Sequence, residues 1–173
     1  IEKVMGKKEE MHGADHGHAS PGCGCQSSEP QEFKRPDIVG RAMPQTEESA
    51  LTHWPVQMHL INPNAGYFKG SDLLVAADCT AFSLGGFHSR FIKGKTVVIA
   101  CPKLDQGTEI YIEKFKSLID DAMVNTITLM IMEVPCCGGL LQMIKLSTEQ
   151  AERKVPVKLI VVGIQGDILK EEW

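Results

Sequence analysis

Residues 127–134 read ITLMIMEV, and the pair Cys136-Cys137 follows after a single proline. A run of apolar residues without polar alternation is typical of a strand that is buried on both faces of a parallel sheet. Two further runs have the same character and also end directly at a cysteine. They are residues 72–78 (DLLVAAD) before Cys79, and residues 96–100 (TVVIA) before Cys101. These three runs predict three strands of one parallel sheet.

Helical patterns lie between the predicted strands. Residues 108–123 and 139–153 carry apolar side chains at helical spacing, and residues 82–91 predict a shorter helix. Thr108 stands where it could cap the first of these helices. Two more strands are predicted, at residues 56–61 and 157–163. The alternation predicts an α/β fold, a Rossmann-like, doubly wound open parallel sheet of about five strands.

The first 50 residues differ from the rest of the chain. They are rich in Gly, Pro, Ser and His and show no sustained apolar period. This composition predicts an irregular tail or linker, because it cannot bury enough apolar surface to fold alone. Residues 51–173 carry the predicted strands and helices and indicate one α/β domain. The chain begins at Ile1 without a signal peptide, so we expect a missing upstream segment and a cytoplasmic protein.

The bulk composition argues against two classes of partner. The 173 residues include 18 basic and 22 acidic ones, for a net charge of −4. A nucleic-acid-binding protein needs a basic face, which this balance does not indicate. The longest apolar runs are far shorter than the roughly 20 residues that a membrane-spanning helix needs. We therefore expect neither nucleic acid nor a membrane as a partner.

Four cysteines follow the three central strands, and they predict a metal centre. The carboxyl ends of parallel strands meet at one edge of the sheet, where open α/β sheets bind their ligands. Helix N-termini at that edge stabilise thiolates. Four thiolates can hold a [4Fe–4S] cluster or a tetrahedral zinc ion. Adjacent cysteines converge poorly on one ion but can reach two irons of a cluster. The predicted ligands of an iron–sulfur cluster are therefore Cys79, Cys101, Cys136 and Cys137.

Three alternatives stay open at this edge. The cysteines could build a zinc-binding structural or regulatory module. They could serve a thiol-dependent enzyme, with Cys136 or Cys137 as the nucleophile and Glu133 or His53 as the base. They could also be free thiols that only pack the strand ends. The polar neighbours of the cysteines would orient ligands, hold protons or cap helices, and Asp105 is placed to cap the helix at 108–123. These neighbours are Asp78, Lys103, Asp105 and Glu133.

The tail carries a second set of residues that can bind a metal. Their side chains suit zinc, nickel or iron, but the spacing matches no standard zinc finger, and the surrounding Gly, Ser and Ala favour a flexible linker. The set consists of His12, His16, His18, Cys23 and Cys25.

Short motifs around the cysteines resemble a known family. They are LLVAADC (73–79), ACPKLD (100–105) and EVPCCGGL (133–140), together with WPVQ at 54–57. In these blocks the chain is similar, over about residues 50–173, to the C-terminal cysteine-containing domain of ferredoxin-type 4Fe–4S-binding proteins of anaerobic bacteria and archaea. The resemblance implies that the four cysteines match those of the family. It also implies that a two-cluster ferredoxin module precedes Ile1.

The resemblance and the cysteines together predict an electron-transfer protein rather than a stand-alone enzyme. Redox proteins and the upstream ferredoxin module would be its partners, and a homo-oligomer stays open. None of the C-x₂-C-x₂-C-x₃-C ligands of a bacterial ferredoxin lies within this chain, so its cluster would be a separate one.

Overall fold

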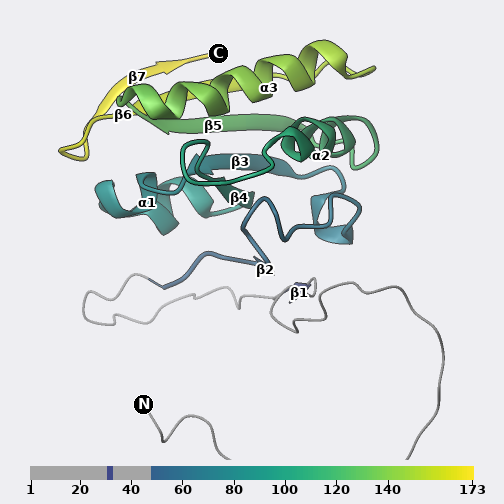
Figure 1. Cartoon of the computed structure of the whole chain (residues 1–173). Coiled ribbons are helices and arrows are strands. Elements are labelled where there is room, and N and C mark those ends of the chain that lie inside the picture. The colour runs from purple at the N-terminus through teal and green to yellow at the C-terminus, as the bar shows by residue number, and fades with distance from the viewer. Residues whose placement is uncertain (1–30, 33–47) are drawn as a thin grey trace, which may run out of the picture.

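The computed structural model describes residues 31–32 and 48–173, and its centre is a five-stranded sheet of order β4-β3-β5-β6-β7 (Figure 1). The strands are β3 (Asp72–Ala77), β4 (Thr96–Ala100), β5 (Thr126–Met132), β6 (Val157–Val162) and β7 (Ile168–Glu172). The first four run parallel, and β7 pairs antiparallel with β6. The chain therefore has the Rossmann-like α/β fold that the sequence predicted.

The register brings the carboxyl ends of the parallel strands to one edge of the sheet. Leu73 in β3 lies opposite Thr96 in β4 and Ile127 in β5, and Ile127 lies opposite Val157 in β6. These partners all stand at or next to the beginning of their strands, so the amino ends lie level with one another. The carboxyl ends lie together at the opposite edge, the left-hand end of the molecule in Figure 1.

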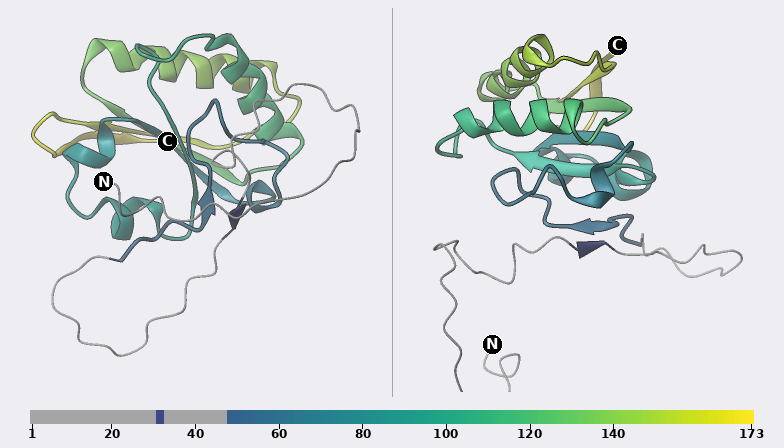
Figure 2. Two further views of the ribbon diagram at one scale, coloured as in Figure 1. Left: turned by 60° about the horizontal axis from the view of Figure 1, so that its bottom comes forward. Right: turned by 90° about the vertical axis from the view of Figure 1, so that its right-hand side faces the viewer.

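Helices cover the two faces of the sheet. The longer ones, α2 (Glu109–Asp120) and α3 (Gly138–Gln150), lie on one face. The short α1 (Thr80–Ser83) and a π-helical turn, η4 (His88–Ile92), lie on the other (Figure 2). Two 3₁₀ turns complete the set, η3 (Gly66–Phe68) and η5 (Pro135–Cys137). The α2 helix begins after Thr108, as predicted, although the Thr108 side chain makes no capping hydrogen bond.

Two predicted elements differ in the structure. The helix expected at 82–91 is split into α1 and η4, because Gly86 adopts a φ of 69° that a regular helix does not allow. The strand expected at 56–61 is reduced to one bridge between Gln57 and Ile99. Its chain turns instead, since the backbone N–H groups of Leu60 and Ile61 both donate to the Gln57 carbonyl.

A short antiparallel pair lies outside the main sheet. Its strands are β1 (Gln31–Glu32) and β2 (His53–Trp54), with Gln31 opposite Trp54.

The β7 strand was not predicted from the sequence. Its sequence ILKEE is mostly exposed and polar, so it lacks the apolar run that marks the buried strands.

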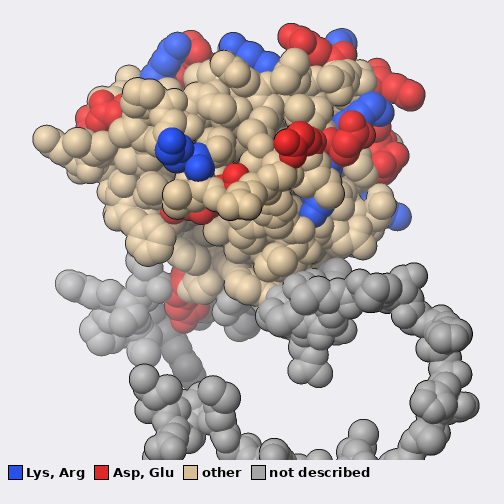
Figure 3. Space-filling model, in the orientation of Figure 1, with Lys and Arg blue, Asp and Glu red and all other residues tan. Residues whose placement is uncertain are grey.

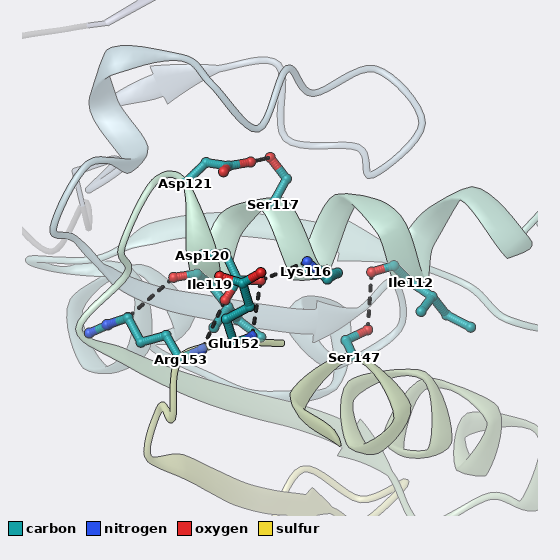
Figure 4. A network of polar contacts seen from close by, with 9 residues as sticks. All are labelled: Ile112, Lys116, Ser117, Ile119, Asp120, Asp121, Ser147, Glu152 and Arg153. Atoms are coloured by element: carbon teal, nitrogen blue, oxygen red, sulfur yellow. Dashed lines mark hydrogen bonds and ion pairs between the residues drawn. The ribbon is translucent and has the colours of Figure 1, made fainter. Parts of the chain in front are cut away.

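A network of polar contacts joins α2 to α3 and to the segment that follows α3 (Figure 4). The Asp120 carboxylate at the end of α2 pairs with the Lys116 ammonium at 2.9 Å and accepts hydrogen bonds from the backbone N–H groups of Glu152 and Arg153. The Arg153 guanidinium donates to the Val124 carbonyl at 2.7 Å. The network fixes the two helices over the sheet, and a continuous apolar core lies beneath them.

Across residues 31–32 and 48–173, no helix has both the length and the apolar character that crossing a membrane requires.

Candidate metal centre

The structure places four cysteines at the carboxyl edge of the sheet. Cys79 lies two residues after the end of β3 and immediately before α1. Cys101 directly follows β4. Cys136 and Cys137 form the end of η5, which follows β5, and Cys137 immediately precedes α3. Because β4, β3 and β5 are adjacent and parallel, three strands deliver their cysteines to the same edge.

Two neighbouring thiols act on the buried thiol of Cys137. Cys137 is buried and its pKa is raised, first by burial and then by the neighbouring thiols of Cys136 and Cys79. Cys79 and Cys136 are exposed, so the buried sulfur lies below an open surface. The contribution of Cys79 is informative because this residue is 58 positions away in sequence and comes from a different strand.

Cys101 reaches the same edge through its loop. A Cβ atom built on Gly139 would lie 3.1 Å from the Cβ atom of Pro102, so the loop after β4 packs tightly against the first turn of α3. A side chain at position 139 would crowd Pro102, so glycine suits this approach. Pro102 directly follows Cys101, and Gly139 is two residues after Cys137, so the two cysteine-bearing segments touch. Cys101 itself is half-buried.

All four of these cysteines are free thiols. Within the described ranges, no three His, Cys, Asp or Glu side chains are already arranged around the position of a single metal ion. The structure thus brings the predicted ligands to one edge, and their role as ligands stays a prediction.

Asp105 has a different task from the predicted helix cap. Its Oδ2 atom accepts hydrogen bonds from the Cys101 backbone N–H at 2.9 Å, from the Tyr111 hydroxyl at 2.7 Å and from the Gln57 amide at 3.3 Å. These contacts shape the turn that begins at Cys101. Cys101 and Tyr111 lie only 4 and 6 positions from Asp105, whereas the contact with Gln57 spans 48 positions and has no local signal.

Asp78 is a polar group without a partner at the same edge. Its Oδ1 atom is buried and has no hydrogen-bond partner in the described part of the chain. Burial raises the pKa of Asp78, and the negative charge of Asp105 raises it further. A buried oxygen of this kind costs free energy unless a further group satisfies it. Among the described residues the buried His53 Nδ1 atom and the Tyr67 hydroxyl also lack a partner, so this feature is not confined to the cysteine edge.

The two candidate bases for a thiol enzyme have structural tasks. Glu133 accepts a hydrogen bond from the Ile164 backbone N–H at 2.9 Å and so holds the turn between β6 and β7. His53 is fully buried, and its Nε2 atom accepts from the Val97 N–H near the start of β4. Burial lowers the pKa of His53 to about 4. Val97 lies toward the other end of β4 from Cys101, so His53 does not belong to the cysteine edge.

Two concavities occur elsewhere on the described surface. One, of about 360 Å³, lies between α3 and the strands β6 and β7, and the other, of about 320 Å³, lies near the amino ends of β3 and β5. No cysteine lines either of them.

The second predicted set of ligands lies outside the described residues. It comprises His12, His16, His18, Cys23 and Cys25.

Comparison with known proteins agrees with this fold. The model of the Rossmann-like domain family matches residues 65–173, and the chain belongs to this family. It is 30% identical over 120 residues to an uncharacterized protein of Archaeoglobus fulgidus, a match that covers 68% of this chain and 82% of the archaeal one. No solved structure matches significantly.

These findings overturn the resemblance to ferredoxin-type 4Fe–4S-binding proteins. The matching family is a Rossmann-like domain and the archaeal relative is uncharacterized, so neither points to a ferredoxin-type domain. The short motifs misled because a strand-to-helix turn in this fold selects small residues for its own reasons, as Gly139 against Pro102 illustrates. The expected ferredoxin module upstream of Ile1 rested on that resemblance. The metal centre was inferred separately, from the cysteines.

Proposed function

We propose that this domain binds a [4Fe–4S] cluster at the carboxyl edge and transfers electrons through it. Cys79, Cys101, Cys136 and Cys137 are its ligands. The observation that carries the proposal is that three adjacent parallel strands deliver four cysteines to one edge of the sheet. Thiols from separate strands seldom gather at an open ligand-binding edge for packing alone, because packing needs neither sulfur nor exposure.

The geometry of the pair favours a cluster over a single zinc ion. Both sulfurs of adjacent residues would have to point at one zinc ion at about 2.3 Å each. In the structure Cys136 is exposed whereas Cys137 is buried, so the two side chains lie at different depths. A cluster has irons at separate corners and can accept one sulfur above and one below. The α3 helix begins immediately after Cys137, and its N-terminal N–H groups favour the negative charge of thiolates.

A thiol enzyme receives less support from the same edge. A nucleophilic cysteine needs a lowered pKa and a base within hydrogen-bond reach. The pKa of Cys137 is raised instead. His53 is buried away from the cysteine edge, and one oxygen of Glu133 already accepts the Ile164 N–H. Free thiols at an exposed edge suit a reducing compartment, so we also propose that the protein works in the cytoplasm.

The test is to produce the full chain without oxygen and measure iron, acid-labile sulfide and zinc. We expect about four irons and four sulfides per chain, with a broad visible absorbance that dithionite bleaches. Serine replacements of the four ligands, made one at a time, should each lower the iron content. One zinc per chain without iron would contradict the proposal in favour of a zinc module.

The cysteines of the tail provide a matched control. The double variant Cys23→Ser/Cys25→Ser removes two thiols that are not assigned to the edge. It should keep the iron and sulfide content of the wild type. Loss of the cluster in this variant, together with retention after Cys101→Ser, would show that the four-cysteine assignment is wrong.

A further inference from the structure

A second candidate site lies on the face of the sheet opposite α2 and α3. It is the concavity of about 320 Å³ near the amino ends of β3 and β5. Lys158 and Ile160 of β6 line it, whereas Leu159, which stands between them, lines the other concavity together with side chains of α3. Because successive residues of a strand point to opposite faces of the sheet, this concavity opens on the face away from α3. Figure 3 shows the other face, over α2 and α3, where Lys and Arg are interspersed with Asp and Glu.

The floor of this concavity combines an apolar side chain with a hydroxyl that has no partner. Ile160 is 3% exposed, and Thr128 in the adjacent strand β5 is 7% exposed. The Thr128 hydroxyl has no hydrogen-bond partner among the described residues, and because it is not sealed from solvent it is open to the concavity that it lines. A hydroxyl both donates and accepts hydrogen bonds. The floor therefore offers a ligand one apolar contact and one hydrogen-bonding group.

The charged side chains around the concavity leave one positive charge without a counterpart. Five charged residues line it, namely Arg90, Lys95, Lys158, Asp72 and Glu171. Lys158 pairs with Glu171 at 2.5 Å, so these two charges cancel. Arg90 and Lys95 form no ion pair within the described part of the chain. Asp72, whose Oδ1 atom accepts the Thr126 hydroxyl, offsets only one of them. A ligand with a single negative charge would therefore balance the site.

Two aromatic side chains also line the concavity. The Arg90 guanidinium lies over the Phe91 ring, 5.0 Å from its centroid, and the Lys158 ammonium lies 5.2 Å from the centroid of the Trp173 ring. Trp173 is 75% exposed, so most of its indole surface is not packed against the protein. An exposed aromatic face at the side of a concavity is suited to stack on a planar ring.

We propose that this concavity binds a small aromatic carboxylate, a planar molecule of one or two rings with one acidic group. The ring stacks on Trp173 above Ile160, and the carboxylate binds Arg90 and Lys95. The Thr128 hydroxyl bonds a polar atom of the ligand. A volume of about 320 Å³ stands at the lower end of the range for ligand pockets and suits one or two rings.

The charge balance selects a carboxylate over a phosphate. A phosphate monoester carries between one and two negative charges at neutral pH, whereas the site has one positive charge to spare. No cysteine lines the concavity, so the binding needs no metal and does not depend on the proposed function.

The test uses the full chain and 2-naphthoate as the probe. Isothermal titration calorimetry should give a Kd of about 0.1–1 mM, which is the affinity expected for a ligand of this size. The indole N–H signal of Trp173 in a nitrogen–proton NMR spectrum, assigned with the variant Trp173→Phe, should shift on binding. The amide 2-naphthamide keeps the rings but lacks the charge, so it should bind at least about tenfold more weakly.

Substitutions of the lining residues test the assigned contacts. Lys95→Gln and Arg90→Gln should each weaken the binding of 2-naphthoate about five- to tenfold, because each removes a charged donor. Lys93→Gln is the matched control, since this exposed lysine stands two positions from Lys95 but does not line the concavity, and the Kd should not change. Thr128→Val keeps the shape of the floor and should raise the Kd about three- to tenfold, with a melting temperature no lower than that of the wild type.

Several outcomes would overturn this inference. A Kd for 2-naphthoate above about 10 mM, or equal affinity for the acid and the amide, would show that the concavity does not bind aromatic carboxylates. A shift of the Trp54 indole signal without one of Trp173 would place the probe elsewhere. Adenosine 5′-monophosphate represents the competing class, and if it bound tenfold more tightly than 2-naphthoate, the ligand would be a phosphate. None of these results bears on the iron and sulfide content, which tests the proposed function separately.

Discussion

At the amino ends of the parallel strands side chains bond to one another across the sheet, whereas at the carboxyl ends reactive side chains are left open. The Ser71 and Thr96 hydroxyls lie 2.8 Å apart, and the Thr126 hydroxyl donates to the Asp72 carboxylate at 2.8 Å. At the other edge four cysteines are free and Asp78 keeps a buried oxygen without a described partner. At the first edge the hydroxyls pair with one another and with a carboxylate, whereas at the second edge the thiols form no disulfide and the Asp78 Oδ1 atom has no partner among the described residues.

The largest effect that we expect concerns His53, close to the amino end of β4. The pKa of His53 in the folded chain, about 4, lies below the ordinary histidine value of 6.5, so the unfolded chain binds the extra proton first as pH falls. The stability that depends on neutral His53 is present above about pH 6.5 and is lost toward pH 4, by about 3 kcal/mol. Urea unfolding of the metal-free chain at both pH values measures this loss.

The variant His53→Gln should lack this part of the pH dependence, because glutamine does not titrate. The matched control is His59→Gln, which changes an exposed histidine and should retain it. If acid lowered the free energy of unfolding equally in the wild type and in the His53 variant, groups other than His53 would cause the acid sensitivity.

A smaller effect is expected at Asp120, which stabilises α2 and α3. Replacement by alanine removes the acceptor of two backbone N–H groups and the partner of Lys116. We expect the free energy of unfolding to fall by about 1–2 kcal/mol. Asp121→Ala is the control, since this exposed carboxylate accepts the Ser117 hydroxyl (Figure 4) and its loss should cost no more than about 0.5 kcal/mol.

At the carboxyl edge a substitution should raise the free energy of unfolding instead of lowering it. The pKa of Asp78 is raised, so its charged form destabilises the folded state, and this cost grows as pH rises above the ordinary aspartate value of 3.8. Asp78→Asn should therefore raise the stability of the metal-free chain by up to about 1 kcal/mol at neutral pH, and by less in acid. Thermal melts at the two pH values test this. Glu133→Gln, an exposed neighbour, is the control, and a lower melting temperature for the Asp78 variant at neutral pH would contradict the comparison.

The sequence predicts those features of the carboxyl edge that depend on neighbouring residues, and it misses those that depend on residues far away in the chain. Strand burial is a local pattern, so the runs at 72–78, 96–100 and 127–134 predicted β3, β4 and β5, and parallel pairing then placed their cysteines together. The hydrogen bonds of Asp105 to Gln57 and of Glu133 to Ile164 join positions 48 and 31 apart, so they had no local signal. The β7 strand was missed because its five residues are largely exposed and lack an apolar run. The family was misjudged because short motifs reflect turn geometry as well as ancestry.

The smallest effects should come from the cysteines themselves in the metal-free chain. Cys79 and Cys136 are exposed, so serine at either position should change the free energy of unfolding by no more than about 0.5 kcal/mol. Cys137 is buried, and serine there should cost about 1 kcal/mol, because a hydroxyl replaces an apolar thiol. A cluster that binds only the folded state would raise the free energy of unfolding, and each serine replacement should remove that increase. If serine at Cys79 or Cys136 instead destabilised the metal-free chain as much as serine at Cys137, these thiols would be packing residues, and the carboxyl edge would be no more open than the amino edge.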